Sequence, residues 1–208
     1  MTSDNSAASH WNWLPDLLAF GYGLAVAWLF HWQVKDLIWS LWLCSLTVGY
    51  TTILLSIFGP IYRVRKTLTG PVLGLQLAGA LFVLAFFTVH FGMFHFGHSF
   101  FLNQFFPVVD GHRGPPSLAL YRIVLANYWP FILAAVVSER VALRQAVEKP
   151  NMMAPYVNVI RMHLLIFFFA GAAALKLQSF VVYVVVFSVY FFPFRFVRSK
   201  FGGATVSQ

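Results

Sequence analysis

Histidines are concentrated in one apolar part of the chain. His90, His95 and His98 lie close together in a run that is otherwise almost entirely apolar. An imidazole inside a membrane segment is costly, and it usually faces a partner, a cavity or a cofactor. His95 and His98 are three residues apart, so a helix presents both on one face. This spacing favours transition-metal binding through ring nitrogens.

Further candidate ligands flank this run on the same predicted side of the membrane. They are His31, Asp36, Asp110 and His112. Two imidazoles with one or two of these groups would hold zinc, copper or iron at about 2.0–2.2 Å. The alternative is that they are polar residues beside the lipid headgroups. The full set of predicted metal ligands is His90, His95, His98, His112, Asp110, His31 and His163.

A deeper group lies in a later apolar run, which carries Arg161 and His163. Histidines on two different helices, here His90 and His163, would also ligate haem or a metal between them. Their predicted depths differ by about 15 Å at 1.5 Å per residue, which argues against haem. Arg161 and Arg122 are candidates for binding an anionic group or a lipid headgroup. Either side chain can instead extend to the nearer membrane surface.

The composition indicates a membrane protein. Hydrophobic residues make up 60% of the 208 residues and charged residues 10%, whereas soluble domains carry about 25% charged residues. Mean hydropathy is +0.74. Helices satisfy every backbone group internally, so we predict an all-α integral membrane protein. The net charge of +8 comes mainly from short connections between apolar runs, so nucleic acid is not an expected partner.

Six apolar runs predict a single membrane domain over residues 1–208, built as a bundle of six transmembrane helices. The second run is expected to end at Gly59-Pro60. The third is longer than the roughly 20 residues needed to span, so it must tilt, protrude, or break at Gly92 or Gly97. The predicted spans are about 14–32, 37–58, 73–100, 118–137, 156–177 and 180–197.

The basic residues predict the orientation of the bundle. With six spans, one side carries Arg63, Arg65, Lys66, Arg140, Arg144, Lys149, Arg195, Arg198 and Lys200. The opposite side carries Lys35, Arg113 and Lys176. Lys and Arg accumulate on the cytoplasmic side. We therefore expect a multi-pass protein of the bacterial inner (cytoplasmic) membrane with both termini in the cytoplasm, and the lipid bilayer as its first partner.

No recognisable catalytic set accompanies the histidines. All six acidic residues lie at or beyond the ends of the apolar runs, and neither a His-Glu-x-x-His nor a Gly-x-Ser-x-Gly pattern is present. No residue is therefore assigned a catalytic role, and whether the chain is an enzyme stays open. The single cysteine, Cys44, can form no intrachain disulfide.

Three functions remain for such a chain. The first is a histidine-based metal-binding membrane protein with its site near the outer face. The second is an accessory subunit of a larger membrane complex, such as a respiratory or haem-containing one, or a homo-oligomer. It is motivated by the small size and short loops. The third is a transporter or lipid-binding protein that uses Arg122 and Arg161 for an anionic group.

The pattern His90-x-Gly92-x-Phe94-x-x-x-His98 resembles a motif of an uncharacterised family of small multi-pass bacterial membrane proteins. The later Arg161-x-His163 is similar to a second motif of that family. The resemblance implies His90, His98, Arg161 and His163 as the residues to test. Members often carry an acid in the second span near a tryptophan. Residues 39–42, Trp-Ser-Leu-Trp, lack that acid, so the resemblance implies no acid-dependent chemistry for this chain.

Overall fold

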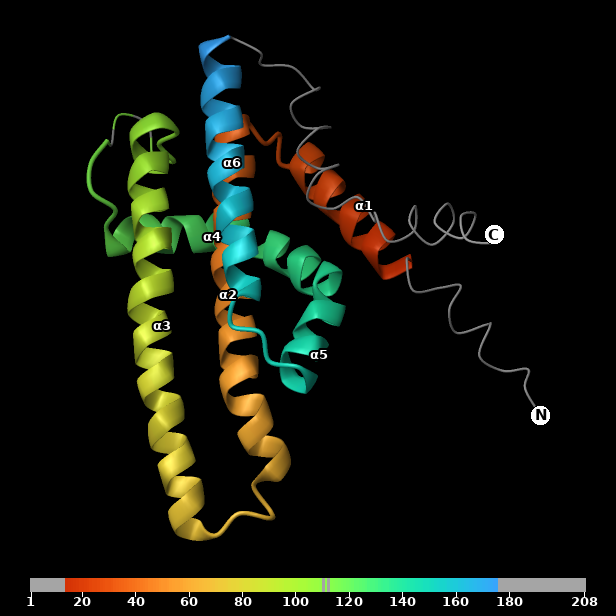
Figure 1. Cartoon of the computed structure of the whole chain (residues 1–208). Helices are drawn as coiled ribbons and strands as arrows, with labels where there is room; N and C mark the ends of the chain where they lie inside the picture. Colours follow the sequence, from red (N-terminus) through yellow and green to blue (C-terminus); the bar gives the residue numbers. More distant parts are fainter. Residues whose placement is uncertain (1–13, 110, 112, 176–208) are drawn as a thin grey trace, which may run out of the picture.

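The computed structural model describes residues 14–109, 111 and 113–175, and all regular structure among them is helical (Figure 1). The predicted sixth span, 180–197, lies outside these residues. The helices are α1 (Leu14–Leu29), α2 (Val34–Val64), α3 (Gly70–Phe105), α4 (Leu118–Ser138), α5 (Arg140–Glu148) and α6 (Ala154–Ala174).

Three of these helices, α2, α3 and α4, are long and apolar enough to cross a membrane. Helix α3 has 36 residues, which corresponds to about 54 Å at 1.5 Å per residue. A bilayer core is about 30 Å thick. The described part of the chain is therefore an all-helical protein whose longest helices suit a membrane.

Helix α2 is the centre of the bundle. It contacts α3, α4, α5 and α6, whereas α1 packs mainly on α4. In its most apolar stretch 61% of the residues are buried, against 6% in that of α3. Helix α3 thus lies at the periphery, and Figure 1 shows it beside α2 along one flank of the molecule. Its buried residues are almost all in its second half, from Phe91 to Asn103.

Hydrogen bonds at the helix ends fix where α2 and α4 begin. The Asp36 carboxylate accepts a hydrogen bond from the Gln33 backbone N–H at 2.8 Å, in the first turn of α2. The same carboxylate accepts the hydroxyl of Tyr128, on α4, at 2.6 Å. Ser117 Oγ accepts from the Leu120 N–H at 3.2 Å and caps α4. A polar contact in the first turn of α2 thereby joins α2 to α4.

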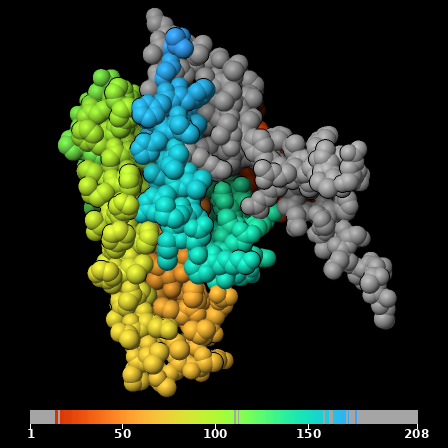
Figure 2. Space-filling view, in the orientation of Figure 1, coloured from red at the N-terminus to blue at the C-terminus, as the bar shows by residue number. Residues whose placement is uncertain are grey.

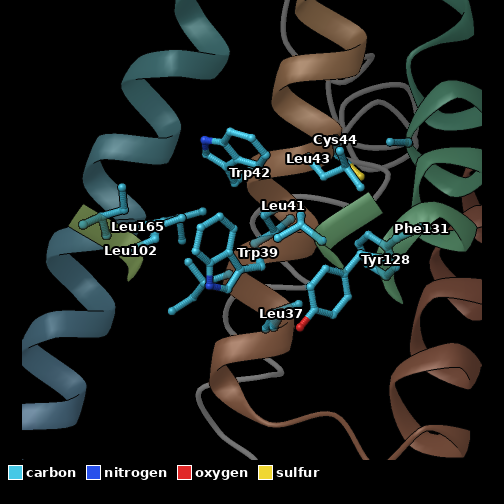
Figure 3. Packing of buried hydrophobic residues seen from close by; sticks show 14 of the residues in the cluster. Leu37, Trp39, Leu41, Trp42, Leu43, Cys44, Leu102, Tyr128, Phe131 and Leu165 are labelled. Atoms are coloured by element: carbon cyan, nitrogen blue, oxygen red, sulfur yellow. The ribbon is translucent and has the colours of Figure 1, made fainter. Parts of the chain in front are cut away.

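A cluster of buried apolar and aromatic side chains holds α2 against its neighbours (Figure 3). Trp39 is fully buried, and its indole N–H donates to the Phe106 carbonyl at the end of α3 at 2.8 Å. Tyr128 and Phe131 enter the cluster from α4. Cys44 is also part of it and is 5% exposed. Most of the buried hydrophobic residues that the structure describes belong to this cluster, and close van der Waals packing of this kind holds helices together in a membrane.

Two helices continue past residues at which the sequence suggested an end or a possible break. Helix α2 continues through Pro60 to Val64, beyond the expected end at Gly59-Pro60. Helix α3 runs unbroken through Gly92 and Gly97. Proline removes one backbone donor but does not prevent a helix from continuing where neighbouring elements support it. Here α5 packs closely on Gly59, since a Cβ at that position would lie 3.0 Å from Val147 Cγ1.

Candidate functional site

The structure joins one pair of the predicted histidines directly. His98 Nε2 lies 2.9 Å from Nδ1 and 3.1 Å from Nε2 of His163. The two residues come from α3 and α6, and their ring centroids are 4.1 Å apart. His98 is 6% exposed. The contact places two imidazoles together in the second half of α3, where that helix is packed most tightly.

Neighbouring backbone groups orient the ring of His163. Its Nδ1 lies 3.1 Å from the Val159 carbonyl oxygen, one turn earlier on α6. A carbonyl only accepts, so this contact requires the tautomer that carries the proton on Nδ1. The same Nδ1 also lies 2.9 Å from His98 Nε2. The Nδ1 atom of His98 is buried without a hydrogen-bond partner among the described residues. The pair thus has one ring oriented by its own helix backbone and one ring whose hydrogen bonding is incomplete.

His95 faces α2 and is tied to it. Its Nε2 lies 3.3 Å from Ser45 Oγ, and its Nδ1 lies 3.2 Å from the Phe91 carbonyl. The His95 carbonyl accepts the indole N–H of Trp42 at 3.0 Å. The rings of His95 and His98 are 6.0 Å apart. Although the two histidines share a helix face as expected, both ring nitrogens of His95 are occupied by protein groups.

His90 pairs with a tyrosine rather than with another histidine. Its Nδ1 lies 2.6 Å from the hydroxyl of Tyr156, at the start of α6. Its ring stacks on Phe86 at 5.6 Å and meets Phe94 edge-on at 5.3 Å. Helices α3 and α6 therefore lie side by side, with His90 opposite Tyr156 and His98 opposite His163.

The flanking candidates do not join the pair within the described residues. Asp36, expected near the histidines, instead binds Tyr128 and the Gln33 N–H. His31 is exposed after the end of α1, with a positive φ of 51°. Asp110 and His112 lie outside the described residues. Among the residues that the structure describes, no group of three or more His, Cys, Asp or Glu can hold a metal.

The structure describes the side chain of only one of the two arginines. Arg122 is exposed on α4. Arg161 lies on α6, two residues before His163, and its side chain is outside the described set. The predicted role of these arginines in binding an anionic group stays a prediction.

A second polar group, which sequence reasoning missed, lies between α2, α3 and α4. The indole of Trp42 stacks on Tyr121 with ring centroids 5.6 Å apart and planes 7° from parallel. The Tyr121 hydroxyl and Ser99 Oγ are 2.8 Å apart. Ser99 directly follows His98, so its polar side chain was a visible signal. Its partner on α4, Tyr121, could not be predicted, because the order of helices around a bundle cannot be read from local sequence patterns.

A groove of about 450 Å³ runs between α3 and α6. His90, His98 and His163 line it together with apolar and aromatic side chains. Figure 2 shows α3 and α6 side by side along one face of the molecule. The histidine pair is therefore buried from one side by the core and approached from the other through a surface groove.

Fold and site together define an all-helical protein, with helices long and apolar enough for a membrane, that carries a histidine pair between α3 and α6. The chain belongs to a family of unknown function (DUF6498), whose model matches residues 17–192. The match includes His90, His98 and His163. No curated protein and no solved structure matches the chain.

Proposed function

We propose that this chain is a histidine-based metal-binding membrane protein, with His98 and His163 as its protein ligands. The observation that carries the proposal is the 3.1 Å separation between the two Nε2 atoms, which belong to residues 65 positions apart in sequence. Two neutral imidazoles this close either share one hydrogen bond or bind one ion. When the pair binds one ion, each imidazole donates a nitrogen lone pair to the metal.

The geometry of the pair suits a single ion. With nitrogen–metal distances of about 2.0–2.1 Å, two nitrogens 3.1 Å apart subtend roughly 100° at the metal, near the tetrahedral value. In haem, by contrast, two axial nitrogens lie on opposite sides of the iron and about 4 Å apart. The separation supports a lone zinc, copper or iron ion over haem. Imidazole nitrogen suits all three metals.

The surroundings of His163 match those of a metal ligand. Ligating histidines usually donate their second ring N–H to a carbonyl or carboxylate, which fixes the tautomer and orientation of the ring. The Val159 carbonyl occupies this position, 3.1 Å from Nδ1. Two protein ligands leave positions that water or a molecule from the groove would fill. Such a site is open, as in catalytic or transport centres, rather than closed as in structural ones.

We also propose six spans in a bacterial inner membrane, with both termini in the cytoplasm. The described helices support this orientation because a hydrogen bond links two of the basic stretches. The Arg63 guanidinium donates to the Glu148 carbonyl at 3.3 Å, which joins the end of α2 to the end of α5. Arg65, Lys66, Arg144 and Lys149 lie close by in sequence. Clustered Lys and Arg mark the cytoplasmic face.

Metal analysis of the full chain tests the proposal. The protein is extracted in mild detergent, loaded with zinc, copper(I) or iron(II), freed of excess metal, and measured by mass spectrometry. We expect one ion per chain in the wild type and its loss in His98→Ala and His163→Ala. His31→Ala, which changes an exposed histidine after α1, should retain the ion. Equal metal content in all four folded proteins, or none in the wild type, would refute the proposal.

The same preparation tests whether the protein is a subunit of a larger complex. A stable, monodisperse particle of a single chain argues against an obligatory partner. Co-purification of other membrane chains at fixed stoichiometry supports one.

A further inference from the structure

We propose that the groove between α3 and α6 binds a neutral, membrane-soluble molecule with a flat, hydrogen-bonding ring, of the quinone class. The groove measures about 450 Å³, within the range of small-molecule sites. The site is a separate property from metal binding, because it depends on the shape and lining of the groove and not on an ion. Four observations support this choice of ligand.

The first is the surface onto which the groove opens. Met93 and Phe167, which line it, are 64% and 68% exposed, and nearby Val89 is 67% exposed. These apolar residues lie on helices α3 and α6, and α3 is one of the helices suited to a membrane. A molecule that reaches the groove therefore arrives sideways from the hydrocarbon, and it must be soluble there.

The second is charge. The residues described as lining the groove include no Lys, Arg, Asp or Glu. Among these described residues a phosphate or carboxylate headgroup would lose its hydration without meeting a counter-ion, which is strongly unfavourable. The polar side chains among them are imidazoles. A neutral headgroup with carbonyl or hydroxyl oxygens is the match for such a lining.

The third is the aromatic wall. Phe94, Phe101 and Phe167 line the groove, and aromatic faces favour stacked or edge-on contact with another flat ring. Histidines lie toward both ends, with His90 and His98 about 12 Å apart along the helix. His90 has its Nδ1 bonded to Tyr156, so its Nε2 is the ring nitrogen left for a ligand. A flat ring that lies against this aromatic wall can place an oxygen within hydrogen-bonding reach of His90 Nε2.

The fourth is the floor of the groove at Gly97. A Cβ built at this position would meet nothing within 4 Å, and Gly97 lines the groove. The helix backbone is therefore open to a ligand there. A larger side chain at residue 97 would extend into the space that we assign to the ring.

Gly97→Leu is thus the blocking variant, and Gly92→Leu is its matched control. Both glycines lie on α3, and a Cβ at either meets nothing within 4 Å. Only Gly97 lines the groove. Leucine has a higher helix propensity than glycine, so both variants should fold at least as well as the wild type.

The experiment measures binding of decyl-ubiquinone to the full chain in nanodiscs after chelator treatment, so that no metal is present. We expect saturable binding in the wild type and in Gly92→Leu, and affinity weakened at least ~10-fold in Gly97→Leu. Dodecyl phosphate, which carries a charged head, should not compete. Absence of saturable binding, equal affinities in the two leucine variants, or equal competition by dodecyl phosphate would each overturn the proposal.

The outcome is separable from that of the metal experiment. Quinone binding is measured on metal-free protein, whereas metal content is measured without added quinone. Loss of metal in His163→Ala with retained quinone binding in the metal-free wild type would support both proposals. A negative result in one experiment refutes only the proposal that this experiment tests.

Discussion

The ring of Phe91 lies directly against the backbone of Gly49. A Cβ at residue 49 would be 2.3 Å from Phe91 Cζ, closer than any real contact. Phe91 is fully buried, and its ring centroid is 4.4 Å from that of His95. The missing side chain at residue 49 therefore lets α3 approach α2. This contact fixes the rotation of α3 that directs His95 toward α2 and His98 toward α6.

Gly49→Ala should destabilise the bundle, because its methyl group must displace Phe91. Overpacking of this kind costs about 1–3 kcal/mol. The free energy of unfolding, measured by SDS titration in mixed micelles, should fall by that amount. Gly21→Ala on α1 is the control, since a Cβ there meets nothing within 4 Å. A variant at residue 49 as stable as this control would show that the close approach does not exist.

Tyr128→Phe should weaken the connection between α2 and α4. It removes the hydroxyl that donates to Asp36 Oδ1 at 2.6 Å, and a hydrogen bond to a charged group is worth about 1.5–3 kcal/mol. The same SDS titration measures the loss. Tyr22→Phe, at a tyrosine that is 40% exposed, should change stability by less than about 0.5 kcal/mol. Similar effects of the two substitutions would contradict the proposed contribution of the Asp36 contact.

Gly59→Ala should loosen α5 from α2. The added methyl would lie 3.0 Å from Val147 Cγ1 and 3.2 Å from its backbone Cα, which cannot move without shifting α5. Brief trypsin treatment in detergent should then cleave α5 faster, for instance after the exposed Arg144. Gly79→Ala, where a Cβ meets nothing within 4 Å, should keep the wild-type cleavage rate. Equal rates in both variants would rule out tight packing of α5 on Gly59.

His95→Ala should lower stability without loss of metal, because His95 has a structural role and is not one of the proposed ligands. Its two ring nitrogens contact Ser45 Oγ and the Phe91 carbonyl. Removing this buried ring should cost about 2 kcal/mol or more in stability. The metal content of the folded variant should stay at the wild-type level, unlike that of His98→Ala. Loss of metal from a folded His95→Ala protein would show that His95 is a metal ligand after all.

The sequence alone predicted the class of fold, because long apolar runs with few charges leave helices as the economical structure. It did not predict the true end of α2. The prediction stopped at Pro60, but contacts with α5, through Gly59 and the Arg63–Glu148 hydrogen bond, accompany the continuation of the helix to Val64. Such contacts join residues distant in sequence, and local patterns carry no information about them.

The candidate site was predicted in its residue types but not in its pairing. His98 was grouped with outer-side residues, and His163 was placed deeper in the membrane. In the structure the two meet at 2.9 Å. Their meeting depends on the relative depth of α3 and α6, which the intervening α4 and α5 set. Asp36 is the opposite case. The predicted topology placed its carboxylate close to the histidines, but in the structure it accepts a hydrogen bond from Tyr128 instead.

The burial of Cys44 gives this protein a built-in reporter of its own opening. It is the single cysteine of the chain, and it is 5% exposed within the cluster on α2. A maleimide reacts with this thiol when the neighbouring helices separate. The rate of alkylation therefore reports how often the helices of the wild-type protein open.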